Sequence, residues 1–376
     1  MRIVFTGGGS GGHIYPIIAV KRALDKTPGI NPEYLYIGPD NFSLNIFKKE
    51  GIKCNFILSG KIRRYFSFSN FIDLAIKIPI GLVQALWYLF WFMPDIIFSK
   101  GGYGSIPVVI AGWLYRIPII IHESDTVAGI ANKLASRFAQ KVIVSFEETK
   151  KSFPSKKTIV IGNPIREELI NGDPEIGKEI FNLKKEKPVL LIMGGSQGAQ
   201  KINEIILNLL PRLLEKCEII HICGVRNFLF LKREKESLLD GSEENKEKSK
   251  YYHLYSFLEE DKLKHAYAVA DIIISRAGAG SIFEIAALGK PSILIPLSNS
   301  ASDHQNKNAQ ALARINGAIV LNEENLTVNM FLRTVFDLID NPEKIKTIAQ
   351  NAKSFYNPNT NKEIVNEILK IIKYTS

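Results

Sequence analysis

Residues 1–13 read Met1-Arg2-Ile3-Val4-Phe5-Thr6-Gly7-Gly8-Gly9-Ser10-Gly11-Gly12-His13. The apolar run at 3–5 is typical of a short buried strand, the glycines that follow indicate a turn, and a helical pattern covers 16–26. Glycine lets backbone amides approach a ligand closely, and the N-terminus of the next helix attracts anions. This order of strand, glycine turn and helix predicts the first unit of a parallel α/β sheet.

Short apolar runs of the same kind recur along the chain and alternate with helical patterns. In the first half they lie at 34–37, 95–98, 118–121 and 141–144. The pattern restarts after Gly162-Asn163-Pro164, with runs at 189–193, 218–223, 251–254, 271–274 and 292–295. Such alternation predicts doubly wound parallel sheets, and 376 residues exceed one ordinary core. We therefore predict two domains, 1–161 and 162–342, with C-terminal helices at 343–376 that pack back toward the N-terminal domain.

The composition is that of a globular protein, with 46% hydrophobic and 23% charged residues. The chain contains only three cysteines, and they form no CxxC pair. We interpret them as buried thiols in a reducing compartment. The opening strand and glycine cluster do not resemble a signal peptide, so we expect a cytoplasmic location.

The net charge of +10 is concentrated in the first half of the chain. Residues 1–161 carry 20 Lys and Arg against 10 Asp and Glu, whereas the remaining residues carry 28 of each. A basic surface of this kind suits an anionic membrane, a pyrophosphate substrate or nucleic acid. No recognised nucleic-acid-binding module accompanies the charge, so we expect no nucleic-acid partner.

The segment 61–93 combines basic and aromatic residues. Its apolar part, 78–93, is shorter than the roughly 20 residues of a membrane-spanning helix, and Pro79 and Gln84 interrupt it. We predict that 78–93 is a core helix of the first domain. The basic aromatic cluster Arg63-Arg64-Tyr65-Phe66 is the predicted contact with an anionic membrane surface.

Three predicted strand–helix junctions carry glycine turns, at 7–12, 194–199 and 276–281. Repeated turns of this kind favour phosphate or diphosphate binding. The first turn also matches GxGxxG, but the second strand ends at Gly38-Pro39, and Asp40 lies too late to bind a ribose as in dinucleotide sites. We therefore predict a phosphate-bearing ligand other than a dinucleotide.

Polar residues beside these turns are the candidate functional groups. His13 lies inside the first turn, where it could act as a general base. His122-Glu123-Ser124-Asp125 follows a buried strand, where α/β sites are built. Three further candidates lie in the second domain: Arg166 for a phosphate, Glu284 for a ribose diol, and Asp303-His304-Gln305 at a helix start, where Asp303 could cap the helix.

The chain has no DxD pair and no cluster of His, Cys and carboxylates that resembles a metal site. We expect no metal and no cofactor. Charge on a leaving phosphate would then be met by backbone amides, helix dipoles and Arg166.

Taken together, the motifs resemble the MurG family of N-acetylglucosaminyltransferases of peptidoglycan synthesis. The family's GGxGGH, GGYxSxP-like, HExN, GNPxR, GGSQGA and DxQxxNA patterns have counterparts in order over nearly the whole chain. These are residues 8–13, 101–107, 122–125, 162–166, 194–199 and 303–309, with the third glycine turn and Glu284 before the last. Two positions depart from the family, since Asp125 replaces an asparagine and Ser281 replaces a threonine. A carboxylate can accept hydrogen bonds but not donate them, which leaves the role of Asp125 open.

The resemblance implies a GT-B fold, two Rossmann-like domains facing across a cleft. The donor would be UDP-N-acetylglucosamine, the acceptor the undecaprenyl-pyrophosphoryl-muramyl-pentapeptide lipid I, and the product lipid II. The implied acceptor residues are Ser10, Gly11, Gly12 and Tyr103. The implied UDP-N-acetylglucosamine residues are Ser10, Gly11, Gly12, Asp125, Arg166, Ser196, Leu258, Ala279, Gly280, Ser281, Ile282, Phe283, Glu284 and Gln305. Leu258 would supply backbone contacts to uracil. The enzyme would be peripheral, at the cytoplasmic face of the inner membrane.

Direct attack by an acceptor hydroxyl would invert the anomeric carbon and would need one base. His13 is the candidate for this base, and Glu123 is the reserve. Two alternatives keep the UDP-sugar site: a diacylglycerol glycosyltransferase, and a regulator that binds UDP-sugar without catalysis. A UDP-sugar epimerase could also have two such domains, but it would not need a basic aromatic surface.

Overall fold

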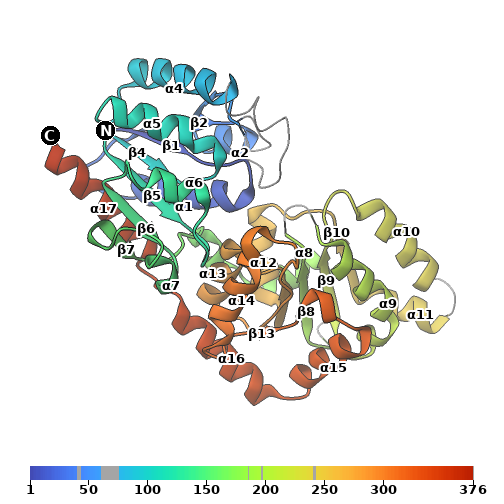
Figure 1. Ribbon diagram of the computed structural model, residues 1–376. Helices are drawn as coiled ribbons and strands as arrows, with labels where there is room; N and C mark the ends of the chain where they lie inside the picture. Colours follow the sequence, from blue (N-terminus) through green and yellow to red (C-terminus); the bar gives the residue numbers. More distant parts are fainter. Residues whose placement is uncertain (40–43, 61–75, 185, 196–197, 240–242, 376) are drawn as a thin grey trace. The chain divides into compact units, whose positions relative to one another are not determined.

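The chain folds into two compact units, seen in a computed structural model that describes residues 1–39, 44–60, 76–184, 186–195, 198–239 and 243–375 (Figure 1). Unit 1 comprises Met1–Ile165 and Asn357–Ser376, and unit 2 comprises Arg166–Tyr356. Each unit is built on one parallel sheet, as the alternating pattern predicts.

The sheet of unit 1 has seven parallel strands in the order β3-β2-β1-β4-β5-β6-β7. They are β1 (Arg2–Thr6), β2 (Glu33–Gly38), β3 (Lys53–Phe56), β4 (Ile96–Ser99), β5 (Ile119–Glu123), β6 (Lys141–Val144) and β7 (Thr158–Val160). Strand β1 lies in the centre, where Ile3 is in register with Tyr34 of β2 and with Ile96 of β4. The turn that opens the sequence therefore leaves the middle of the sheet.

Helices cover both faces of this sheet. They are α1 (Gly11–Asp25), α2 (Leu44–Lys49), α4 (Ile78–Phe92), α5 (Ile106–Leu114), α6 (Ile130–Ala135), α7 (Glu147–Lys150) and α17 (Thr360–Thr375), with short 3₁₀ turns η2 (Tyr103–Ser105) and η3 (Ser155–Lys157). On one face, Ile3 and Phe5 pack with residues of α1 and α17. On the other face, Val4 packs with residues of α4 and α5. Successive residues of β1 thus point into two different cores, as expected for a strand that is buried on both faces of the sheet.

Helix α4 confirms the prediction of a core helix at 78–93 in part, since Ala85 and Leu89 belong to the core of unit 1 and Leu82, Leu86, Tyr88 and Phe92 pack against it. Only Gly81, Ala85 and Leu89 are buried, a single narrow stripe at a spacing of four residues. A Cβ on Gly81 would lie 1.9 Å from the carbonyl oxygen of Leu58, so the helix approaches its neighbours closely at this position. Its other faces expose large apolar side chains: Ile80, Val83, Trp87, Phe90 and Trp91. The cluster at residues 63–66, the predicted membrane contact, lies outside the described residues.

Across the described part of the chain, no helix is both long and apolar enough to cross a membrane.

The sheet of unit 2 has six parallel strands in the order β10-β9-β8-β11-β12-β13. They are β8 (Val189–Met193), β9 (Glu218–Ile222), β10 (Tyr252–Tyr255), β11 (Ile272–Ser275), β12 (Ser292–Leu294) and β13 (Ile319–Val320). The helices are α8 (Pro174–Phe181), α9 (Gln200–Lys216), α10 (Phe228–Leu239), α11 (Glu243–Ser249), α12 (Glu260–Val269), α13 (Ala279–Leu288), α14 (His304–Ala313), α15 (Val328–Ile339) and α16 (Pro342–Phe355), and the 3₁₀ turns are η4 (Glu167–Asn171), η5 (Ala301–Asp303) and η6 (Glu323–Asn325).

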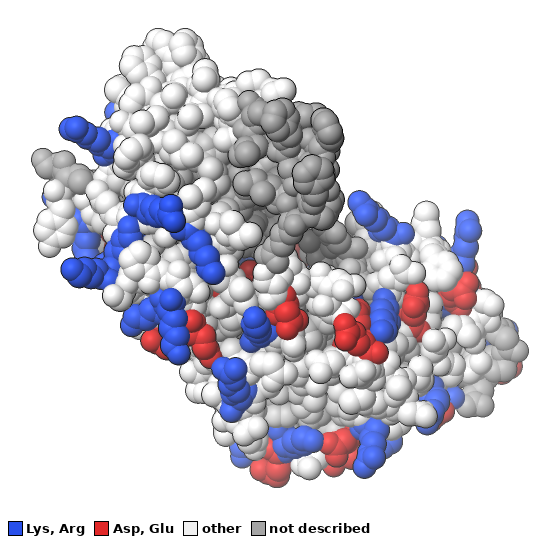
Figure 2. Space-filling model, in the orientation of Figure 1, with Lys and Arg blue, Asp and Glu red and all other residues white. Residues whose placement is uncertain are grey.

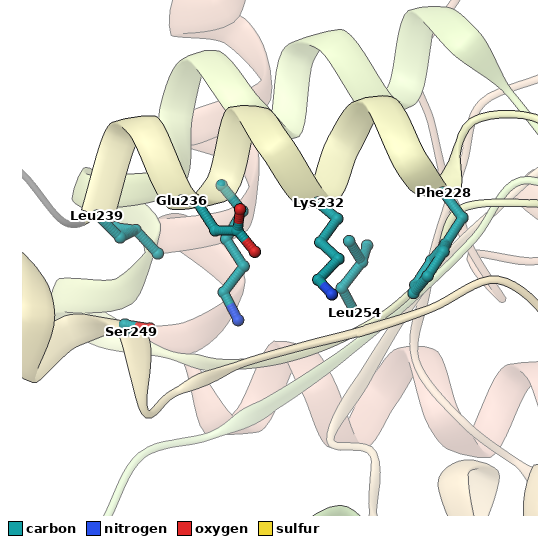
Figure 3. Close-up of a pocket in the computed structure, with 7 residues that line it drawn as sticks. Phe228, Lys232, Glu236, Leu239, Ser249 and Leu254 are labelled. Carbon is teal, nitrogen blue, oxygen red and sulfur yellow. The ribbon is translucent and has the colours of Figure 1, made fainter.

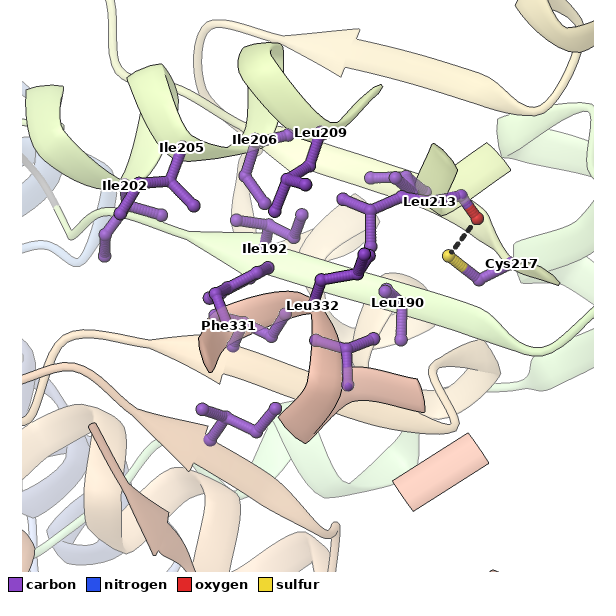
Figure 4. Packing of buried hydrophobic residues seen from close by; sticks show 14 of the residues in the cluster. Leu190, Ile192, Ile202, Ile205, Ile206, Leu209, Leu213, Cys217, Phe331 and Leu332 are labelled. Carbon is purple, nitrogen blue, oxygen red and sulfur yellow. Dashed lines mark hydrogen bonds between the residues drawn. The ribbon is translucent and has the colours of Figure 1, made fainter. Parts of the chain in front are cut away.

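One core of unit 2 lies between β8, α9 and α15. Figure 4 shows apolar residues of α9, among them Ile202, Ile206 and Leu213, directed toward Ile192 of β8. Phe331 and Leu332 of α15 close the same cluster, and the Cys217 thiol donates to the Leu213 carbonyl at 3.0 Å. Burial raises the pKa of this thiol to about 12. Cys217 therefore belongs to the packing of the core.

Three strands that the pattern did not reveal lie at sheet edges. They are β3 and β7 in unit 1 and β13 in unit 2, and each is short and only partly buried or polar. An edge strand needs less apolar side chain than a central one, so its sequence signal is weaker.

The unit boundaries differ from the predicted ones. The break follows Ile165 because residues 161–165 are still tied to unit 1: Thr360 Oγ1 donates to the Ile161 carbonyl at 3.2 Å and Asn361 Nδ2 to the Ile165 carbonyl at 2.9 Å. The range 343–376 does not act as one segment. Helix α16 packs against α13 within unit 2, whereas α17 packs against α1 within unit 1.

Candidate active site

The first glycine turn connects the central strand β1 to helix α1. Ser10 occupies the N-cap position, its side chain forms no capping hydrogen bond, and its carbonyl accepts from the His13 amide at 2.9 Å. The first amides of a helix have no partner within the helix. The turn therefore offers backbone donors and the positive end of a helix dipole at the carboxyl end of the sheet.

A second glycine turn packs directly on the first one. Gly102 follows β4 with a left-handed φ of 83°, and a Cβ there would lie 3.0 Å from the Gly8 amide nitrogen and Cα. Only glycine permits this approach. Tyr103 follows immediately in η2, so the structure brings the predicted acceptor residue Tyr103 beside the turn that holds Ser10, Gly11 and Gly12.

His13 is oriented by this packing. Its Nδ1 lies 3.1 Å from the carbonyl oxygen of Lys100, which can only accept, so Nδ1 carries a proton and Nε2 is the basic nitrogen of the neutral ring. A Cβ on Gly8 would lie 3.1 Å from Nε2, and one on Gly102 would lie 3.4 Å from it. Nε2 therefore borders backbone that carries no side chains at these two positions.

The environment keeps His13 neutral. Burial and the positive charge of Lys100 lower its pKa below the usual 6.5, and the hydrogen bond to the Lys100 carbonyl and the charge of Asp125 oppose this only partly. An imidazole with a lowered pKa is unprotonated near neutral pH. It can accept a proton there, as the sequence predicts for a general base.

Glu123 holds the loop that follows β5. Its Oε1 accepts from the Asp125 amide at 3.1 Å, and its Oε2 accepts from the Gly129 amide and from Asn132 Nδ2, both at 2.9 Å. Burial raises the pKa of Glu123 most, and the negative charge of Asp125 raises it further. Both carboxylate oxygens thus serve the loop on which Asp125 lies.

Lys100, which none of the sequence motifs indicates as a functional residue, is buried directly after β4. Its ammonium lies 2.6 Å from His122 Nδ1, contacts Ser124 Oγ and reaches Asn163 Oδ1 at 3.5 Å. Burial lowers its pKa, and the charges of Glu123 and Asp125 oppose this. In the sequence, Lys100 lies between the apolar strand 96–99 and the pair Gly101-Gly102, and this position could have marked it as a candidate site residue.

In unit 2, Arg166 and Glu284 come together although 118 residues separate them. Arg166 Nη2 donates to Glu284 Oε1 at 2.9 Å and Nη1 to Glu260 Oε2 at 3.3 Å, while the Tyr267 hydroxyl donates to Glu284 Oε2 at 3.0 Å. The guanidinium, for which contact with a phosphate stays a prediction, binds two carboxylates. The reason is burial, since a charge removed from water needs an opposite partner.

The third glycine turn leads into α13 and leaves room above it. Gly278 is the N-cap, and a Cβ on Gly278 or Gly280 would meet no atom within 4 Å. The amides of Ala279, Gly280 and Ser281 lie in the first helical turn, where amides lack helical partners. This end of α13 can receive an anion.

Two predicted ligand contacts on α13 belong to the core. Ile282 and Phe283 are buried, the Ile282 amide donates to the Gly278 carbonyl at 3.1 Å, and the Phe283 ring packs 5.4 Å from that of Phe355. Helical periodicity turns these side chains inward, so they support the turn from below.

The remaining predicted donor residues lie near the carboxyl edge of the second sheet. Leu258 is buried directly before α12. Gln305 Oε1 accepts from the Leu297 amide at 3.0 Å and so fixes the loop before α14. Asp303 occupies the N-cap of α14 with φ of 57°, but its side chain does not cap the helix as predicted and instead accepts from Asn306 Nδ2 at 3.2 Å. Ser196 lies outside the described residues.

Among the described side chains, no group of three or more His, Cys, Asp and Glu residues is placed to hold a metal ion. A pocket of 220 Å³ lies between α10 and β10 (Figure 3), and none of the predicted site residues lines it. Its lining is Phe228, Lys232, Lys235, Glu236, Leu239, Ser249 and Leu254.

Comparison with known proteins identifies the chain's relatives. Residues 3–144 match the glycosyltransferase family 28 N-terminal domain, and residues 189–368 match its C-terminal domain. A Bacillus cereus protein named UDP-N-acetylglucosamine–N-acetylmuramyl-(pentapeptide) pyrophosphoryl-undecaprenol N-acetylglucosamine transferase 2 is 43% identical over 348 residues, which are 92% of this chain and 94% of the relative. A Clostridium perfringens protein named as the same transferase is 40% identical over 99% of this chain and 98% of the relative.

This chain belongs to the MurG family. The crystal structure of Acinetobacter baumannii MurG matches 98% of this chain and 99% of that chain, with a TM-score of 0.73 and 26% identity. The predicted family and the GT-B fold with two Rossmann-like domains are confirmed. A Neisseria meningitidis UDP-GlcNAc 2-epimerase reaches a TM-score of 0.70 at 17% identity, which reflects the shared fold alone.

The buried ion pair predicts a structural cost for loss of Glu284. The Glu284→Ala variant leaves the Arg166 guanidinium buried with Glu260 as the remaining carboxylate, so we expect the free energy of unfolding of unit 2 to fall by roughly 3–5 kcal/mol. The matched control Tyr267→Phe removes one hydrogen bond to Glu284 and should cost about 0.5–1.5 kcal/mol. The change in the free energy of unfolding of each variant is measured by urea titration, with hydrogen exchange of unit 2 peptides as the signal. Equal midpoints for the two variants would contradict a buried, charge-paired Arg166.

Proposed function

We propose that this chain transfers N-acetylglucosamine from UDP-N-acetylglucosamine to lipid I, the N-acetylmuramyl-(pentapeptide) pyrophosphoryl-undecaprenol, to give lipid II for peptidoglycan synthesis. The observation that carries the proposal is 40–43% identity, over nearly the whole chain, to relatives that are named for this transfer. Glycine turns at the carboxyl ends of both sheets support it, since donor and acceptor each carry a diphosphate.

The donor is assigned to unit 2. The unpartnered first-turn amides of Ala279, Gly280 and Ser281 and the open space above Gly278 support binding of the UDP diphosphate there. Glu284 lies one helical turn further on α13, where its carboxylate can accept hydrogen bonds from the ribose diol. Arg166 acts on the donor through Glu284, which it holds in place. The uracil is assigned to the backbone at Leu258.

The acceptor is assigned to unit 1. Its pyrophosphate lies on Ser10, Gly11 and Gly12 at the N-terminus of α1, with Tyr103 beside it. The attacking sugar hydroxyl gives its proton to His13 Nε2 while its oxygen bonds to the anomeric carbon of the donor. The bond from that carbon to UDP breaks, and UDP leaves with the electron pair, so the configuration inverts. Amides at α13 stabilise the charge that develops on UDP. Asp125 accepts hydrogen bonds from bound sugar.

A transfer assay tests the proposal. The intact protein is incubated with radiolabelled UDP-N-acetylglucosamine and a short-chain lipid I analogue, and a parallel reaction contains diacylglycerol. Labelled lipid II analogue is the expected product. Label on diacylglycerol alone would support the diacylglycerol glycosyltransferase, and UDP-sugar binding without any labelled lipid would support a non-catalytic regulator.

His13→Ala should lower kcat by about 10²–10⁴-fold, the usual effect of removing a general base. Donor affinity should hold, because the donor is assigned to unit 2. The wild-type rate should fall as the pH drops through the pKa of His13, which lies below 6.5, since protonation removes the base. The variant should lose this acidic limb. The control His253→Gln, on β10 and paired with Glu218, should keep it.

Kinetics with both substrates decide between the two base candidates. A raised KM for the acceptor with unchanged kcat in His13→Ala would make His13 a binding residue. Glu123→Gln would then be examined in the same assay.

We assign the enzyme to the cytoplasmic face of the inner membrane as a peripheral protein that binds through α4. Trp87 and Trp91 are 60% and 65% exposed, with ring centroids 5.7 Å apart, and Phe90 lies beside them. In Figure 2 the surface over α4, at the top of the view, carries almost no charged side chain. An apolar helix face on a basic half of the chain suits an anionic membrane surface.

The double substitution Trp87→Ala with Trp91→Ala should weaken binding to anionic vesicles at least tenfold, because each large apolar side chain contributes about 1.5–3 kcal/mol on burial. Phe230→Ala, which removes an exposed aromatic ring from α10 of unit 2, is the matched control and should bind as the wild type does. Sedimentation over a salt series measures both effects, since salt weakens the electrostatic part. Equal binding to neutral and anionic vesicles would contradict the role of the basic residues.

A further inference from the structure

Lys100 is a buried lysine with no role in the proposed transfer, and burial lowers its pKa to about 7 while the charges of Glu123 and Asp125 favour its charged form. It ends the central strand pair at the carboxyl edge of the sheet, where its amide donates to the Thr6 carbonyl at 2.8 Å, and only 2% of the residue is exposed. Burial of an ammonium is costly unless its protons are all accepted and an opposite charge is near. The contacts of the buried ammonium therefore indicate its role in the structure.

Hydrogen-bond directions around Lys100 identify its acceptors. His122 Nε2 lies 3.0 Å from the Gly162 carbonyl and must donate to it, so Nδ1 is unprotonated and accepts from the Lys100 ammonium. Ser124 Oγ donates to Asn163 Oδ1 at 3.0 Å and so also presents a lone pair to Lys100. Burial and the charge of Lys100 lower the pKa of His122 well below its usual value, which keeps it a neutral acceptor.

These contacts join three segments that leave strands β4, β5 and β7 of the same sheet. Lys100 follows β4, His122 and Ser124 belong to the end of β5, and Asn163 follows β7. The direct ligands of the ammonium are all neutral. The compensating charges are Glu123 and Asp125 on the loop after β5. A single ammonium thus fixes the three segments relative to one another.

The same residue also orients His13. The Lys100 carbonyl accepts from His13 Nδ1, and a Cβ on Gly7 would lie 3.4 Å from the Cβ atoms of both His13 and Lys100. Among the described residues, the charged groups that act on the His13 ring are Lys100 directly after β4 and Asp125 after β5, while the turn that contains His13 presents glycine backbone and Ser10. A displacement of the Lys100 backbone would therefore displace the imidazole.

We propose that Lys100 is a positioning residue of the acceptor site, whose ammonium ties the ends of β4, β5 and β7 together and thereby holds the carbonyl that orients His13. The inference rests on the proposed function, in which His13 takes the proton of the acceptor hydroxyl. It assigns to Lys100 an action through His13 and no contact with substrate.

The Lys100→Ala variant tests whether the ammonium holds the ends of β4, β5 and β7 together. We expect kcat to fall on the order of 10²-fold, because small displacements of reacting groups have effects of this size. UDP affinity, measured by calorimetry, should stay within twofold. Ethylammonium in the buffer should restore activity in a saturable manner by replacing the missing cation, and acetamide should not. Lys157→Ala, which removes another partly buried lysine of unit 1 bonded to the Ala139 carbonyl, should keep full activity.

The Lys100→Met variant keeps the side-chain volume and removes the charge. Loss of a neighbouring positive charge raises the pKa of His13, so the acidic limb of the pH–rate profile should move to higher pH. Histidine nuclear magnetic resonance, assigned with His13→Ala, measures the same pKa without turnover. Lys157→Ala should shift neither value.

The outcomes separate this inference from the proposed function. Unchanged kcat and an unchanged His13 pKa in both Lys100 variants, while the wild type makes lipid II analogue, would overturn the role of Lys100 alone. A His13 pKa that moves while the pH–rate profile does not would remove His13 as the base. Loss of folding in both variants, seen by circular dichroism, would assign Lys100 to stability and overturn the inference.

Discussion

The close approach of the two backbone turns at Gly8 and Gly102 is the constraint on which the unit 1 site depends. A Cβ on Gly102 would lie 3.0 Å from Gly8, so neither turn could occupy its place with a larger residue at position 102. This contact follows from the pairing of β1 with β4, in which Thr6 is in register with Ser99. It sets the Lys100 carbonyl against His13 and thereby decides which imidazole nitrogen is basic.

The two units bury charge in different ways. In unit 2 the Arg166 guanidinium meets the carboxylates of Glu284 and Glu260 directly, so charge neutralisation and geometry come from the same contacts. In unit 1 the Lys100 ammonium contacts the neutral acceptors His122, Ser124 and Asn163, and the charges of Glu123 and Asp125 act on it from the loop after β5. The first arrangement holds the Glu284 carboxylate in place on α13, and the second leaves a positive charge beside His13.

Helix α4 connects the fold to the membrane proposal. Gly81, Ala85 and Leu89 face the core, and a Cβ on Gly81 would meet the Leu58 carbonyl oxygen, whereas Trp87, Trp91 and Phe90 lie on the exposed faces. The same packing that attaches the helix to the sheet thus produces an exposed aromatic surface. The proposed acceptor of the enzyme is a membrane lipid, so an exposed aromatic surface can hold the enzyme at the membrane that contains its substrate.

The sequence by itself determined the alternation of strands and helices, the central strands of both sheets, the three glycine turns and the family, because these features depend on local periodicity and on residues that are neighbours in the chain. It also placed His13 in the first turn. Only the tertiary structure decided that Lys100 is buried among His122, Ser124 and Asn163, that Arg166 pairs with Glu284, and that Ile282 and Phe283 face the core. It likewise divided α16 from α17 between the units. Contacts between residues 22 or 118 positions apart arise from packing, which sequence spacing does not encode.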